Sequence, residues 1–259
     1  MTTHDQITRL TVQPLGGPTA ILEYAGLRWL TDPAFSPPGE YAGLVKTAAP
    51  AVPADAIGSI DVVLLSHDHH SDNLDPGGRA YLPRAGKVLT TVAGARRLGG
   101  NTTGVEPWSS VDLTNPQGSV VTVTAVPAQH GPDGSDEVMG PVIGFLLQST
   151  GGDTVYVSGD NASLEVVREI ADRAGPVGVA ILFAGAVQRP SELDCAYLTL
   201  SSDHAADAAK LLGVHTVVPL HYEGWTHFTQ GAHELRAAFA GNGISDRLAL
   251  AEPGIRITV

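Results

Sequence analysis

A short apolar run that leads directly into a cluster of metal-capable side chains is the feature that most constrains this chain. Residues 62–65 are Val-Val-Leu-Leu, which is typical of a buried strand, and residues 66–73 are Ser-His-Asp-His-His-Ser-Asp-Asn. Side chains alternate along an extended segment, so we expect His67 and His69 to point to the same side. Two imidazoles at one strand end make half of a site for a first-row metal ion. A polar surface loop without function is the weaker interpretation, because such clusters are typical of metal or catalytic sites.

Three more apolar strands end in a residue that can bind a metal ion, namely His130, Asp160 and His221. Strand ends gather at one edge of a layered sheet, where ligand sites lie. We expect His67, His69 and His130 to hold one divalent ion. Asp160, His221 and a group from the first stretch would hold a second ion, with Asp160 as the bridging carboxylate. Paired ions polarise a substrate oxygen and lower the pKa of bound water toward ~7, which supplies a nucleophile at neutral pH.

Length and charge limit the kind of protein that carries such a site. The 259 residues suit one domain, which we place at residues 1–259 because no linker divides the chain. The net charge is -12, with 15 Lys and Arg against 27 Asp and Glu, so a broad basic face for nucleic acid is not expected. The single cysteine excludes a disulfide framework and a multi-cysteine metal site.

The chain shows no signal peptide and no apolar run of about 18 residues, which predicts a cytoplasmic protein that does not contact a membrane. A small-molecule substrate is the expected partner. The sequence leaves a homo-oligomer open.

Both halves of the chain share one plan, a meander of strands followed by alternating strands and helices. The predicted strands are residues 7–12, 20–24, 28–31, 62–65, 87–91, 111–113, 120–126, 142–147, 154–157, 177–183, 216–220 and 256–259. The predicted helices are residues 92–98, 163–174, 201–212 (or from 202) and 230–240. We expect a chain break at the Pro-Gly-Gly of residues 76–78 and a functional lid in the long loop 35–53. The plan favours two αβ layers packed sheet to sheet.

Five segments carry a resemblance that covers nearly the whole chain. They are Leu30-Thr-Asp-Pro33, Ser66-His-Asp-His69, Pro127-Ala-Gln-His130, Ser158-Gly-Asp160 and Pro219-Leu-His221-Tyr. In this order they resemble the metallo-β-lactamase superfamily, in the branch of ascorbate-6-phosphate-lactonase-like hydrolases. The resemblance implies an α/β fold, the four-layer αββα sandwich of the metallo-β-lactamase fold. It also implies one or two Zn or Mn ions at one edge of the two sheets.

The chain departs from the family pattern His-x-His-x-Asp-His after His69. Without a gap, Ser71 replaces the aspartate and Asp72 replaces the last histidine. With one inserted residue, Asp72 matches the aspartate and Asn73 replaces the histidine, and the following Leu-Asp at 74–75 favours this register. Asp72 is a candidate ligand in both registers.

The second ion thereby loses an imidazole ligand. Asn73 is a weak, neutral ligand, and His70 is a candidate that could take the vacant place. Fewer imidazoles and more oxygen ligands favour Mn over Zn in that site.

Several other polar residues have two interpretations each. His204 is a weak site candidate that faces the substrate, or else a solvated residue in the first turn of a helix. His227 belongs either to a pocket wall or to an exposed loop. We favour Asp32 as a turn cap over Asp32 as an outer partner of a metal-binding histidine. Arg189 and Lys46 are candidate anion contacts, although single basic loop residues are usually only solvated.

These features predict a metal-dependent hydrolase in which a metal-bound hydroxide attacks a carbonyl or phosphoryl centre. The family suggests that Asp72 orients the water or takes its proton, so the catalytic candidates are Asp72 and Asp160. The candidate metal ligands are His67, His69, His130, Asp72, Asp160 and His221, with His70, Asn73 and His204 as further candidates. The bond is an ester or lactone, an amide or a phosphodiester of a small substrate. A non-catalytic metal- or ligand-binding protein on the same scaffold and a nuclease of the same superfamily are the alternatives.

Overall fold

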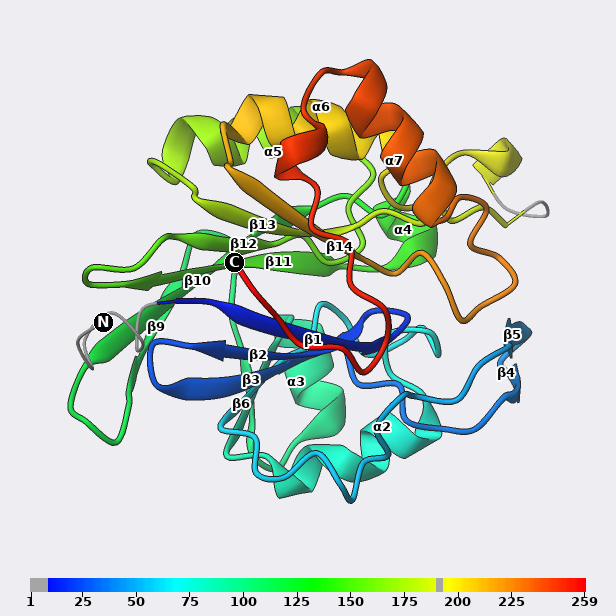
Figure 1. Ribbon diagram of the computed structural model, residues 1–259. Coiled ribbons are helices and arrows are strands. Elements are labelled where there is room, and N and C mark those ends of the chain that lie inside the picture. Colours follow the sequence, from blue (N-terminus) through cyan, green and yellow to red (C-terminus); the bar gives the residue numbers. More distant parts are fainter. Residues whose placement is uncertain (1–8, 190–192) are drawn as a thin grey trace.

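Two β-sheets face each other in the middle of the molecule, and helices cover the outer face of each sheet (Figure 1). The computed structural model describes residues 9–189 and 193–259. The layers run helix, sheet, sheet, helix, which confirms the predicted αββα sandwich. In such a fold each sheet buries one face against the other sheet and its second face against helices.

The first sheet has seven strands in the order β15-β1-β2-β3-β6-β7-β8. Its strands are β1 Thr11–Gly16, β2 Thr19–Tyr24, β3 Leu27–Thr31, β6 Val62–Leu64, β7 Lys87–Thr90, β8 Thr102–Gly104 and β15 Ile257–Thr258. The chain forms an antiparallel meander through β1, β2 and β3, whereas β6 lies between β3 and β7 and is parallel to both. All three residues of β6 are buried, as expected for a strand covered on both faces, and its carboxyl end delivers residues 66–73 to one edge of the sheet.

The second sheet has six strands in the order β14-β13-β12-β11-β10-β9. Its strands are β9 Ser110–Thr114, β10 Val120–Ala128, β11 Val142–Ser149, β12 Val155–Val157, β13 Val179–Phe183 and β14 Thr216–Leu220. Strand β11 is antiparallel to both β10 and β12, and β12, β13 and β14 are parallel. Strands β10, β12 and β14 therefore run in one direction, and their carboxyl ends share one edge of the sheet.

The helices α5 Leu164–Arg173, α6 Ser202–Leu212 and α7 Ala232–Gly241 cover the second sheet, and α2 Pro76–Tyr81 and α3 Val92–Leu98 cover the first (Figure 1). Ser163 and Ser201 cap α5 and α6 as predicted, because each hydroxyl accepts the backbone N–H three residues later. The short elements are α4 Asp136–Met139 and the turns Leu82–Arg84, Leu193–Cys195 and Ser245–Arg247. Over the described ranges, none of the helices combines the length and the apolar character needed to cross a membrane.

Apolar cores lie on both faces of the second sheet. Trp29, Phe145 and Phe183 are fully buried between the two sheets. Leu182 and Phe239 are fully buried between the second sheet and its helices. Close packing on both faces fixes the positions of the strand ends, and the candidate ligands follow those ends.

One prediction about loops is wrong, and a second loop has more regular structure than we expected. The Pro-Gly-Gly segment begins helix α2, because Asp75 Oδ1 accepts the N–H of Gly78 at 2.8 Å and Pro76 stands where no N–H is needed. Loop 35–53 contains a hairpin of β4 Gly39–Tyr41 and β5 Leu44–Lys46. Lys46 is no exposed anion contact, because its Nζ lies 3.0 Å from Asp75 Oδ2 and 2.6 Å from the carbonyl oxygen of Ala34. The lid role of the loop stays a prediction.

Candidate metal centre

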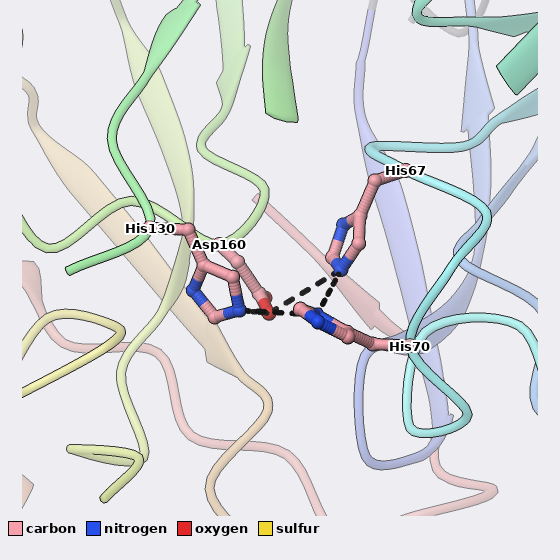
Figure 2. A group of neighbouring side chains, drawn as sticks. All are labelled: His67, His70, His130 and Asp160. Carbon is pink, nitrogen blue, oxygen red and sulfur yellow. Dashed lines mark hydrogen bonds and ion pairs between the residues drawn. The ribbon is translucent and has the colours of Figure 1, made fainter. Parts of the chain in front are cut away.

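Four side chains converge between the two sheets, and we call them the imidazole-rich group. The group consists of His67, His70, His130 and Asp160. Figure 2 shows that His67 and His70 come from the segment after β6, and that His130 and Asp160 reach them from the other sheet. His70 Nδ1 lies 2.9 Å from His67 Nε2 and 3.2 Å from His130 Nε2. Asp160 Oδ2 lies 3.5 Å from His130 Nε2 and 4.0 Å from His67 Nε2.

A second set, the carboxylate-rich group, consists of Asp72, Asp160 and His221. His221 Nε2 lies 3.3 Å from Asp72 Oδ2 and 3.7 Å from Asp160 Oδ1. Asp160 thus turns Oδ2 toward the imidazole-rich group and Oδ1 toward the carboxylate-rich group. One carboxylate stands between the two groups, which is the position that a bridging ligand requires.

The rings of His69 and His70 both lie near His67, at 4.7 and 4.8 Å between ring centroids, but only His70 turns a ring nitrogen toward His67 Nε2. The Nε2 of His69 is hydrogen-bonded to the carbonyl oxygen of Met139, and a Cβ added at Gly140 would lie 2.7 Å from that Nε2. The alternation that placed His67 and His69 on one side assumes an extended backbone, but β6 ends at Leu64 and residues 66–73 form bends and turns. His69 lies outside both groups, so its role as a ligand stays a prediction.

A chain of hydrogen bonds holds His67 at Nδ1, the ring nitrogen that faces away from the other ligands. Ser66 Oγ lies 2.9 Å from His67 Nδ1 and donates to Asp32 Oδ2 at 2.6 Å. Asn73 Nδ2 donates to Asp32 Oδ2 and to Asp160 Oδ1, both at 3.1 Å. Outer hydrogen bonds of this kind orient metal-binding side chains. Asp32 therefore acts as an internal acceptor that links both groups and is not the turn cap that we favoured.

The backbone at two strand ends is specialised. His221 has a φ of 59°, a left-handed conformation that is uncommon outside glycine, and a Cβ at Gly185 would lie only 2.1 Å from the carbonyl oxygen of His221. Gly159 has a φ of 58°, and a Cβ there would lie 2.6 Å from the carbonyl oxygen of Ile143. Glycine at 159 and 185 thus permits the close approach that brings Asp160 and His221 into the site.

Burial keeps the imidazoles neutral. Burial lowers the pKa of His130 to about 3 and the pKa of His70 to about 4, and it holds the pKa of His67 well below the usual value. The Nδ1 of His130 donates to the carbonyl oxygen of Leu198 at 2.6 Å, which leaves Nε2 free to face the other ligands. Neutral imidazoles near pH 7 are the form that binds a metal ion.

The two carboxyl groups behave in opposite ways. Burial and the charge of Asp72 raise the pKa of Asp160 well above the usual value. Against the effect of burial, the neighbouring imidazoles of His221 and His227 hold the pKa of Asp72 well below the usual value. Two buried carboxylates this close are not both ionised without a compensating positive charge, so the site is built for a cation.

Unpaired buried atoms support a metal ion at this place. Within residues 9–189 and 193–259, Asp160 Oδ2, His221 Nε2 and Asn73 Oδ1 are buried and lack a hydrogen-bond partner. Such atoms are rare in folded proteins. A tetrahedral ion with metal–nitrogen distances of about 2.1 Å would separate its ligand atoms by about 3.4 Å. The pair separations given above run from 2.9 to 4.0 Å and bracket that value, and all ligand atoms within a group lie within 4.8 Å of one another, so the residues present fit a divalent ion.

The sequence left two interpretations each for His227, His204 and Arg189, and the structure shows where these residues lie. His227 lies at the site, with its Nε2 2.9 Å from Asp72 Oδ2. His204 lies in the first turn of α6 outside both groups, and its buried Nδ1 has no hydrogen-bond partner among the described residues. The positive charge of Arg189 reaches His70 and adds to the effect of burial on the pKa of that ring.

Known proteins resemble this chain over most of its length. Residues 28–222 match the family model described as the Beta-lactamase superfamily domain. A UPF0173 metal-dependent hydrolase from Pyrococcus abyssi is 26% identical over 178 residues, which cover 68% of this chain and 73% of that protein. A UPF0173 metal-dependent hydrolase from Rubrobacter xylanophilus is 31% identical over 189 residues, which cover 69% of this chain and 70% of that protein.

The solved structure of an isothiocyanate hydrolase from Delia radicum gut bacteria is similar in fold. It superposes with a TM-score of 0.80 at 21% identity and covers 95% of this chain and 98% of that chain. At this level of identity the likeness supports the fold alone.

Proposed function

The chain belongs to the β-lactamase superfamily domain family and is a metal-dependent hydrolase, and from this premise we propose that it opens an ester or lactone bond of a small substrate. This would place it with the ascorbate-6-phosphate-lactonase-like hydrolases. The observation that carries the proposal is the position of Asp160, whose two oxygens face two separate groups of buried ligand atoms.

The two groups would hold two ions of different character. Three imidazoles and one carboxylate favour Zn in the imidazole-rich group, and two carboxylates with one imidazole favour Mn in the carboxylate-rich group. A bound divalent ion polarises the substrate oxygen and lowers the pKa of water.

Asp72 is the residue to which we assign the orientation of the attacking water. The neighbouring imidazoles of His221 and His227 hold its pKa well below the usual value despite burial, so it is ionised near pH 7 and accepts a hydrogen bond from water. A carboxylate has about four lone-pair sites, enough to face an ion and to orient a water molecule at once. The amide of Asn73 donates to Asp160 Oδ1 and so helps to fix this carboxylate between the two groups.

An apolar cluster adjoins the ligands and favours a substrate with an apolar part. The cluster consists of Met139, Val187 and Leu198, with Leu193 and Phe228 packed against it. Its members contact the site directly, since Leu198 binds His130 through its carbonyl and the Phe228 ring lies 4.2 Å from the ring of His221. With a net charge of -12, this environment favours a small, partly apolar ester over a polyanion.

Metal analysis combined with a substrate panel tests the proposal. We expect the purified full chain to bind at least one divalent ion tightly and His67→Ala to bind less. The panel contains lactones, linear esters, amides and phosphodiesters, each assayed with Zn or Mn, and we expect lactones or esters to turn over fastest. Turnover of phosphodiesters alone, or of no substrate by the loaded protein, would contradict the ester proposal. The second result would instead favour the non-catalytic alternative, and binding of RNA that weakens steeply with salt would favour a nuclease.

A further inference from the structure

We propose that His227 is a positioning residue that holds Asp72 in place for the second ion. The inference rests on the proposed function, because it assumes that the carboxylate-rich group binds an ion. Neither the resemblance to the family pattern nor the composition of the two groups includes His227.

Direct contact between the two side chains is the first support. His227 Nε2 lies 2.9 Å from Asp72 Oδ2, closer than His221 Nε2, which lies 3.3 Å from the same oxygen. The side chain of His227 is 10% exposed and that of Asp72 is 5% exposed. A charge-assisted hydrogen bond shielded from water to this degree is strong enough to fix a carboxylate.

The surroundings of His227 hold its ring in one orientation. The ring lies edge-on to Phe228 at 4.7 Å and to Trp225 at 5.9 Å between centroids. The backbone is tied on both sides, because Thr226 N–H donates to the carbonyl of Val45 and Thr229 N–H donates to the carbonyl of Gly185. The imidazole is therefore a rigid donor toward Asp72.

The hydrogen-bond geometry assigns His227 to a place outside the carboxylate-rich group. The candidate ligand atoms of Asp72, Asp160 and His221 lie within 4.8 Å of one another. An ionised carboxylate only accepts hydrogen bonds, so the His227 Nε2 that faces Asp72 carries the proton and cannot bind an ion through the same lone pair. Carboxylates that bind a metal ion are themselves held by hydrogen bonds from outer groups, and the imidazole of His227 supplies such a bond to Asp72.

The departure from the family pattern explains why this chain depends on such support. Asn73 stands where the pattern has a histidine, and its amide nitrogen donates to Asp32 and Asp160. The carboxylate-rich group thus contains a single imidazole, that of His221. Its affinity for an ion then depends strongly on the orientation of Asp72.

Titration of the metal-free full chain with Mn by isothermal calorimetry tests the inference. In the wild type we expect two classes of binding site. In His227→Ala the weaker class should lose affinity by about 10- to 100-fold while the tighter class is unchanged, the range expected for loss of an outer partner. In His227→Gln the side-chain amide also donates to Asp72, so most of the lost affinity should return. Gln is a poor metal ligand, so this rescue separates positioning from ligation.

His215→Ala is the matched control, because His215 Nε2 also bonds a carboxylate, Asp153 Oδ2 at 3.1 Å, on the exposed surface. We expect it to bind both classes as the wild type does. Three results would overturn the inference. The weaker class of sites could keep its affinity in His227→Ala, or His227→Gln could bind Mn no more tightly than His227→Ala. Both classes could also lose affinity equally while the unfolding temperature falls. Absence of a second class in the wild type would overturn the two-ion proposal itself.

Discussion

The imidazole-rich and carboxylate-rich groups share Asp160 but differ in the protonation states of their other side chains. In the imidazole-rich group, burial makes three histidines neutral ligands that a cation meets without competing protons near pH 7. In the carboxylate-rich group, two buried acids lie side by side, and only one of them is held in the ionised form by neighbouring imidazoles. The comparison teaches that the three imidazoles are in the metal-binding form in advance, whereas Asp160, the acid shared by both groups, would become charged only when a cation binds.

Removal of Asp160, the side chain shared by both groups, should have the largest effect on metal binding and hydrolysis. In Asp160→Ala both groups lose an oxygen ligand, so we expect both ions to be lost and hydrolysis to fall by more than about 100-fold, since loss of an outer partner alone costs 10- to 100-fold. Metal content and turnover are measured on the same sample. Asp153→Ala, which removes an exposed carboxylate, is the control. Retention of either ion in Asp160→Ala would show that the groups are independent.

Replacing His69 and His70 with alanine, one at a time, tests the composition of the imidazole-rich group. We expect His70→Ala to weaken the tighter ion by more than about 100-fold and His69→Ala by less than about tenfold, because only His70 faces His67 and His130. Competition with a fluorescent zinc chelator gives both affinities. The reverse order would restore the family pattern that the sequence predicted.

Replacement of Asp32, which accepts hydrogen bonds from Ser66 and Asn73, should have an intermediate effect on metal binding. In Asp32→Asn the carboxylate that orients Ser66 and Asn73 is lost, and we expect about 10- to 100-fold weaker binding of the tighter ion. The weaker ion should lose less, because Asn73 reaches only Asp160 of that group. Titration calorimetry separates the two affinities, and an effect confined to the weaker ion would contradict this role.

The smallest effects concern the pH dependence of the metal-free protein. His70 titrates at about 4 in the native state and near 6.5 when unfolded, so between these values the unfolded chain binds more protons and the free energy of unfolding rises with pH. Burial raises the pKa of Asp32 from 3.8 to about 7, so the native state binds the extra proton there and the free energy of unfolding falls as pH rises.

Denaturant titrations between pH 4 and pH 7 check these signs. Relative to the wild type, His70→Gln should lower the slope of the unfolding free energy by up to about 1.4 kcal/mol per pH unit, and Asp32→Asn should raise it by a similar amount. If the unfolding free energy had the same pH dependence in both variants, the opposite effects expected for His70 and Asp32 would be contradicted.

Most strands and the layered plan followed from local patterns, whereas the details of the site did not. The apolar run before Ser66 and the alternation in β10 predicted buried and half-buried strands, and both are confirmed. Helix α2 was missed because Pro76 and the two glycines after it look like a break until Asp75 is seen as a cap. The predicted single domain, cytoplasmic setting and small-molecule partner stay predictions.

The choice between His69 and His70 depends on tertiary contacts that no spacing rule contains. The backbone after β6 bends, and the carbonyl of Met139, about 70 positions along the chain, binds His69. His227 was ambiguous for the same reason, because its partner Asp72 lies on the opposite sheet layer. A possible signal was the loss of the pattern histidine at Asn73, which implies that another imidazole supports the site.

The candidate ligands come from both halves of the chain, and this has a consequence for how the protein matures. His67, His70 and Asp72 follow β6 of the first sheet, and His130, Asp160 and His221 follow strands of the second. Neither half alone supplies a complete set, so a cation cannot template either half before the two have docked. Metal uptake is therefore expected late in biosynthesis, after β14 has emerged and paired with β13, and the loaded ion would report on completed assembly of the chain.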